Sequence, residues 1–143
     1  DGVVCYSGGP GIDFYELATG KRLGRHHVKG EGLSFFPQSA PAFHQGRAFV
    51  AKDNVCVMAF SVEGRAVSKL WEVPLKAVVR SGMVLTDNAL LFGGDDGRVR
   101  CLDPGTGAER WRFDCGAPVA TTPIFADGKL YVVDEKGTVR CLK

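Results

Sequence analysis

Long apolar runs are missing from this sequence. No stretch approaches the roughly 18 consecutive apolar residues of a membrane-spanning helix, so we expect no membrane insertion. An excess of one charge is missing as well, since 18 lysines and arginines against 16 aspartates and glutamates leave a net charge of +2. This weak charge argues against binding to nucleic acid or to anionic lipid. The chain starts at Asp1 without a methionine or a signal peptide, and we expect it to be a piece of a longer protein.

Paired cysteines are also missing. The five cysteines lie far apart and form no Cys-x-x-Cys pair, which disfavours a zinc site. They are Cys5, Cys56, Cys101, Cys115 and Cys141. We expect reduced thiols that pack as small apolar side chains.

Helical periodicity is absent, and a repeat of about 42 residues is present instead. Four short apolar runs each follow a turn-like dipeptide, and the second residues of these dipeptides are spaced by 44, 42 and 40 residues. Those residues are Gly2, Gly46, Asn88 and Gly128. The glycines at positions 20, 64 and 107 repeat with nearly the same spacing. A fixed spacing over four units is typical of a repeat protein.

The residue pattern within each repeat is typical of short antiparallel strands. In the third, Asp96-Gly97 separates two β-rich runs, and Val99 and Cys101 then alternate with two arginines. Further strands are expected at residues 39–43, 78–85 and 119–125. We therefore predict an all-β single domain over 1–143, built of four-stranded units with repeats at 1–38, 39–77, 78–117 and 118–143.

Residues 103–111 read Asp-x-x-Thr-Gly-x-x-x-Trp, with Asp103, Thr106, Gly107 and Trp111 at the fixed positions. This pattern resembles the tryptophan-docking motif of β-propellers related to pyrroloquinoline quinone (PQQ) enzymes. We expect Asp103 and Thr106 to bond the turn that Gly107 closes. We expect Trp111 to pack on the adjacent blade, at a cost of about 3–5 kcal/mol when it is truncated to alanine.

The motif is degenerate in the first two repeats. The first has Glu16, Thr19 and Gly20, with Gly24 where tryptophan is expected. In the second, Phe60 stands at the aspartate position, and Trp71 comes three residues late after an insertion around residues 65–69.

The resemblance implies a β-propeller of four-stranded blades, of which about 3.5 are present. The expected count is three strands in the first unit, four in the second and third, and three in the fourth. An open arc exposes apolar faces and unpaired edges. We therefore expect the rest of the ring to come from the same longer chain or by association.

The family also implies several functions. Quinoprotein dehydrogenases hold PQQ and Ca²⁺ in an eight-bladed version, the outer-membrane protein assembly factor B type is a scaffold, and some bacterial Ser/Thr kinases carry such a propeller as a sensor. The docking motif itself is structural, so we predict no enzyme activity, no cofactor and no metal for this chain. The leading hypothesis is a protein-interaction or assembly scaffold with a protein partner. A ligand-sensing domain of a signalling protein and a fragment of a PQQ-dependent oxidoreductase are the alternatives.

Other chemistry-bearing residues have simpler interpretations. We interpret Asp95-Asp96 and Asp134-Glu135 as solvent-exposed turn residues, and His26, His27 and His44 as surface or edge histidines. Arginines recur at positions expected to point outward, where they either protect strand surfaces or form a basic contact surface. They are Arg98, Arg100, Arg110, Arg112 and Arg140. Phe35-Phe36, in a loop rich in Gly, Pro and Ser, is either a packed plug or an exposed contact patch.

Overall fold

The structure is a computed structural model that describes residues 2–29, 39–53 and 55–142. Phe35 and Phe36, interpreted as either a packed plug or an exposed contact patch, lie outside the described residues. The described residues form fourteen strands in four antiparallel sheets of three, four, four and three strands, which confirms the all-β prediction and the expected strand count. No helix in this part of the chain is long and apolar enough to cross a membrane.

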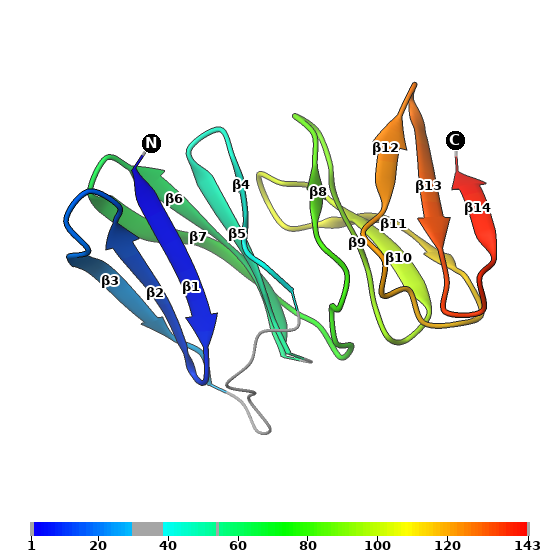
Figure 1. Ribbon diagram of the computed structural model, residues 1–143, viewed down its shortest axis with the longest axis horizontal. Helices are drawn as coiled ribbons and strands as arrows, with labels where there is room; N and C mark the ends of the chain where they lie inside the picture. Colours follow the sequence, from blue (N-terminus) through cyan, green and yellow to red (C-terminus); the bar gives the residue numbers. More distant parts are fainter. Residues whose placement is uncertain (1, 30–38, 54, 143) are drawn as a thin grey trace.

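The four sheets follow one another along the chain and stand side by side in an open row (Figure 1). The first sheet contains β1 (Val3–Gly8), β2 (Gly11–Glu16) and β3 (Arg22–His27). The second contains β4 (Ala42–His44), β5 (Arg47–Lys52), β6 (Cys56–Glu63) and β7 (Ala66–Pro74). The third contains β8 (Val84–Leu85), β9 (Leu90–Gly93), β10 (Arg98–Leu102) and β11 (Glu109–Asp114). The fourth contains β12 (Ile124–Ala126), β13 (Lys129–Val133) and β14 (Val139–Leu142).

The first strands of the second, third and fourth sheets are shorter than expected and begin later. β4 follows Pro41 and β12 follows Pro123, because proline has no N–H to donate to a ladder. β8 is reduced to two residues because the backbone before it bonds the loop between β9 and β10 instead. There Val78 N donates to Asp95 Oδ1 at 2.9 Å, and Asp95 N donates to the Val78 carbonyl at 3.0 Å.

Each middle sheet buries both of its faces, because alternate residues of a strand point to opposite sides. On β5, Val50 belongs to the core shared with the first sheet, while its neighbour Phe49 belongs to the core shared with the third. A third core joins the last two sheets through Leu91 and Val99 on one side and Leu130 on the other. This is the packing of consecutive propeller blades, and Figure 1 shows that the row does not close on itself.

The open face of the last sheet repeats the pattern that is buried one sheet earlier. Tyr131 pairs with Cys141 as Leu91 pairs with Cys101. Leu91 and Cys101 are buried between the sheets, whereas Tyr131 and Cys141 are exposed. The residues are therefore equivalent, and only the absence of a further sheet among the described residues leaves the second pair open.

Candidate interaction site

The turn between β10 and β11 is closed by its own side chains. Asp103 Oδ1 accepts hydrogen bonds from the backbone N–H groups of Gly105 (2.8 Å) and Thr106 (2.9 Å), and Thr106 Oγ1 accepts one from Ala108 N (3.3 Å). Asp103 Oδ2 accepts from Arg110 at 2.5 Å. The bonds from Arg110 and then from Thr106 lower the pKa of Asp103 from 3.8 to about 2. The turn is thus a platform held together by side-chain hydrogen bonds.

The side chain that docks on this platform is Trp71, from β7 of the second sheet. Its indole Nε1 donates to the Pro104 carbonyl at 3.1 Å. The ring lies so close to Gly107 that a Cβ there would come within 2.7 Å of Trp71 Cε3. Position 107 therefore requires glycine for two reasons: its φ is +76°, and the indole leaves no room for a Cβ. Trp71 follows its paired residue Ala59 by 12 positions and Trp111 follows Cys101 by 10, so the structure shows two extra residues rather than the three expected. They do not displace Trp71, because they lengthen the β6–β7 hairpin, which includes the pairs Val62–Val67 and Glu63–Ala66.

The equivalent turn of the first sheet is held by different partners. Thr19 Oγ1 donates to Glu16 Oε2 and Arg65 Nε donates to Glu16 Oε1, both at 2.5 Å. These two bonds, the one from Thr19 first, lower the pKa of Glu16. Gly20 ends the turn at φ +69°, and nothing lies near the place of its missing Cβ. An arginine from the second sheet thus ties down the turn of the first.

In the first sheet, a cavity lies at the position where the docking motif has its tryptophan. Gly24 pairs with Phe14 across β2 and β3, as Trp71 pairs with Ala59 in the second sheet. It lines a cavity of about 120 Å³ between these sheets, together with His26 and Phe60. The His26 ring lies 5.5 Å from the Phe60 ring, so this histidine of the edge strand β3 also contacts the second sheet. Burial, followed by the charge of Lys69, lowers its pKa.

Trp111 faces the last sheet, but no turn covers it among the described residues. It remains 40% exposed, which differs from the expected buried packing. It lines two adjoining hollows, of about 420 Å³ and 250 Å³, and Leu142 lines both of them. The larger also touches Phe113 and Cys141, and the smaller includes Phe125 and Leu130. We call these two hollows the β11–β14 groove. Sequence reasoning missed it. The signal was the difference in strand number, because the third sheet has four strands and the fourth has three.

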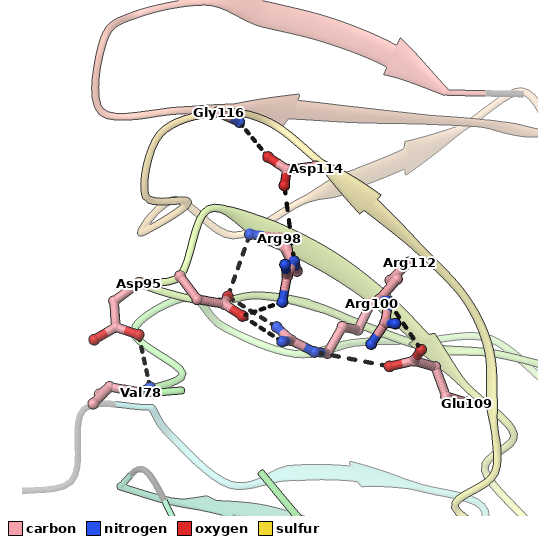
Figure 2. Close-up of polar contacts among 9 residues, drawn as sticks. Val78, Asp95, Arg98, Arg100, Glu109, Arg112, Asp114 and Gly116 are labelled. Atoms are coloured by element: carbon pink, nitrogen blue, oxygen red, sulfur yellow. Dashed lines mark hydrogen bonds and ion pairs between the residues drawn. The ribbon is translucent and has the colours of Figure 1, made fainter. Parts of the chain in front are cut away.

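The arginines of the third sheet form a row of ion pairs instead of an outward basic surface. Figure 2 shows the row, in which carboxylates and guanidinium groups alternate. In order its members are Asp114, Arg98, Asp96, Arg100, Glu109 and Arg112. Arg100 lies opposite Phe92 on the face toward the second sheet and is 6% exposed, so its expected outward orientation is wrong. Arg110 pairs with Asp103 and Arg140 with Asp134, which leaves all five arginines with acidic partners.

The carboxylates of Asp96 and Asp134, expected as solvent-exposed turn residues, are occupied by arginine and backbone donors. Burial raises the pKa of Asp96, but the bonds and the charge of Arg100 outweigh this effect and hold the pKa below its usual value. Asp134 is 4% exposed, contrary to the expectation of an exposed turn, and accepts from Arg140 (2.5 Å) and from the backbone of Thr138 (3.0 Å). In the described ranges, no group of three or more His, Cys, Asp or Glu side chains is arranged to hold a metal ion. Asp96 and Asp134 are therefore not arranged as open ligands for a cation such as Ca²⁺.

The sheets and the docked turn together define a segment of a PQQ-like β-propeller. A family model described as outer membrane protein assembly factor BamB matches residues 57–143, and the chain belongs to this family. It is 25% identical over 153 residues to the serine/threonine-protein kinase AfsK of Streptomyces griseus, covering 98% of this chain and 18% of the kinase. The chain thus spans less than a fifth of the length of this curated relative.

Two solved structures show the same fold. BamB from Moraxella catarrhalis matches with a TM-score of 0.75 at 17% identity, over 98% of this chain and 42% of that chain. Quinohemoprotein alcohol dehydrogenase from Comamonas testosteroni matches with a TM-score of 0.71 at 12% identity, over 92% of this chain and 27% of that chain. At these identities the likeness shows the fold alone.

Proposed function

We propose that this propeller segment is a non-catalytic scaffold that binds another protein. The observation that supports this function is the exposure of large apolar side chains: among the described residues, five lie on or beside the first two sheets and six lie on the last two. Those on the last two sheets are Trp111, Phe113, Ile124, Phe125, Tyr131 and Val139. Exposed apolar patches mark interaction surfaces in soluble domains. The carboxylates of Asp96 and Asp134 bind arginine and are not left open as metal ligands. This arrangement is consistent with a role other than redox catalysis.

Site-specific photo-crosslinking in the natural protein tests this proposal. A photoreactive amino acid at Val139, which is 65% exposed on the open face of the last sheet, should give one defined cross-linked protein species. The same amino acid at Lys69, on the outer strand of the second sheet, is the matched control and should not give it. A folded protein that gives no cross-link at Val139, or one that oxidises alcohols with PQQ and Ca²⁺, would overturn the proposal.

A second candidate is a ligand-sensing domain of a signalling protein. The similarity to the kinase AfsK, which extends over 98% of this chain, favours it. Transfer of the γ-phosphate of ATP to serine or threonine by the natural protein, with a rate that changes when the open face is blocked, would support this role. If the natural protein transfers no phosphate, the sensing role is rejected and only the scaffold function is retained.

A further inference from the structure

The cavity beside Gly24 lies between two neighbouring sheets, and it is not an open end of the row. Its lining comes from β2 and β3 of the first sheet and from β6 and β7 of the second. The cavity has a volume of about 120 Å³. For comparison, an apolar protein cavity of about 150 Å³ binds benzene. The cavity is therefore of the size that a single aromatic ring occupies.

The inner wall of this cavity is aromatic. Phe14 and Phe60 are 1% and 2% exposed, and their rings meet edge to face with centroids 5.0 Å apart. The His26 ring makes a second contact of this kind with Phe60, at 5.5 Å. The space over Gly24 is open, since no heavy atom of the described residues lies within 4 Å of the place of its Cβ. One more ring in this space would find aromatic partners on both sheets.

The charged side chains of the lining are hydrogen-bond donors. Among the described residues, the lining includes Arg25 and Lys69 but no aspartate or glutamate. The Arg25 guanidinium donates to Asp13 at 2.9 Å. The Lys69 ammonium donates to Glu72 at 2.6 Å, which uses one of its three N–H groups. The Lys69 side chain is 39% exposed, so its other N–H groups are open to a ligand that enters from solvent.

We infer that the cavity beside Gly24 binds a small aromatic carboxylate. The ring lies over Gly24 against Phe14 and Phe60, and the carboxylate accepts a hydrogen bond from Lys69 at the outer edge. An apolar and aromatic lining with a few polar groups that fix orientation is the usual composition of a small-molecule site. The site is separate from the proposed scaffold function, which concerns a protein partner.

A titration of the natural protein with 4-fluorobenzoate, followed by ¹⁹F NMR, tests this site. The compound should bind saturably with a Kd of about 1 mM or below, which is reasonable for so few atoms. 4-Fluorobenzyl alcohol has the same ring without the charge and should bind about threefold more weakly, since a half-exposed ion pair contributes little. Lys69→Gln should remove this difference between the two compounds.

Two variants provide the remaining comparison. Gly24→Leu places a side chain in the cavity and should abolish binding of both compounds. Ile124→Ala is the matched control, because Ile124 is on β12 and does not line the cavity, and it should leave binding unchanged.

A measurement on the unchanged sequence decides the location. In protein labelled with ¹³C-histidine, 4-fluorobenzoate should shift the ring signal of His26 and not that of His44, which does not line the cavity. A folding defect of a variant therefore cannot decide the outcome. Absence of saturable binding, or binding that leaves the His26 signal in place, overturns the inference, and equal binding of the two compounds overturns the carboxylate. Cross-linking from Val139 tests the scaffold function separately, because that residue does not line the cavity.

Discussion

Trp71 and Gly107 meet across the boundary between the second and third sheets, and the contact leaves no room for a side chain on Gly107. The nearest atoms of the indole, and Cγ2 of Val73 beside it, would stand 2.7 Å from a Cβ at that position. The indole also donates to the Pro104 carbonyl. One aromatic side chain and one turn therefore join the two sheets in addition to their shared apolar core.

We predict that Gly107→Ala lowers the free energy of unfolding by about 2–4 kcal/mol, measured by denaturant titration. About 1–2 kcal/mol comes from the left-handed backbone and the rest from overlap with the indole. Gly20→Ala is the matched control, because Gly20 has a similar φ of +69° but open space around it. It should lose only the backbone part. Equal losses in the two variants would show that the contact with Trp71 contributes nothing.

Trp71→Ala should cost more stability than Trp111→Ala. Removing the docked indole should lower the free energy of unfolding by about 3–5 kcal/mol, the usual range for a packed tryptophan. Trp111 is 40% exposed and should cost clearly less. Thermal and denaturant unfolding of both variants gives the comparison, and the reverse order would contradict the assignment of Trp71 as the docked residue.

Gly24 is a site where added side-chain volume should stabilise the protein. It lies within β3, no heavy atom lies within 4 Å of the place of its Cβ, and it lines the inter-sheet cavity. Gly24→Ala should gain about 0.5–1 kcal/mol from the lower entropy of the unfolded chain, and Gly24→Leu should gain more by filling the cavity. Gly11→Ala is the control, because its Cβ would meet Arg25 Nε at 2.9 Å, and it should give no gain. A loss of stability in Gly24→Leu would show that the cavity does not accept the side chain.

Asp103 should make stability depend on pH in the acid range. Its pKa falls from 3.8 to about 2 on folding, so the folded state binds its proton more weakly than the unfolded state does. The stabilising contribution is then fully present above pH 3.8 and is lost as the pH falls towards 2. Asp103→Asn should have a lower melting temperature than the unmodified protein at pH 7. The two melting temperatures should become equal near pH 2. Arg110→Gln should reduce the same pH dependence, and a difference that persists unchanged at pH 2 would contradict the assignment.

The cysteines should differ sharply in reactivity. Cys141 is exposed, whereas Cys56 is buried, and burial followed by the charge of Glu72 raises the pKa of Cys56 to about 12. A thiol reagent such as Ellman's reagent at pH 8 should modify Cys141 in the folded protein and Cys56 only after unfolding, because the thiolate is the reactive form. Mass spectrometry without reductant should find no Cys101–Cys141 bridge, since stacked sheets lie ~10 Å apart and a disulfide spans ~7 Å. Detection of that bridge would contradict the equivalent placement of the two residues.

The repeat and its strands were predictable because they depend on local sequence. Glycine turns and alternating apolar residues are encoded within each unit, and these signals gave the four sheets and the count of their strands. The number of residues before Trp71 was misleading, since a longer hairpin absorbs an insertion without moving the residue that pairs with Ala59. Spacing along a strand is therefore a weaker guide than the position across the sheet.

The exposure of individual side chains could not be predicted in this way. Arg100 alternates with apolar neighbours like a solvent-facing residue, yet a second sheet lies over it and Asp96 compensates its charge. Trp111 matches the docking motif more closely than Trp71 does, but no turn among the described residues covers it. Burial in a row of sheets depends on the neighbour, which the sequence of one repeat does not contain.

The unequal joints between the sheets have a consequence for local motion. The second and third sheets share a docked indole in addition to their apolar core, whereas the last sheet is held to the third by its core without such a dock among the described residues. Opening of a protein begins where the fewest contacts must break. We therefore expect the contact between the third and fourth sheets to open before the contact between the second and third.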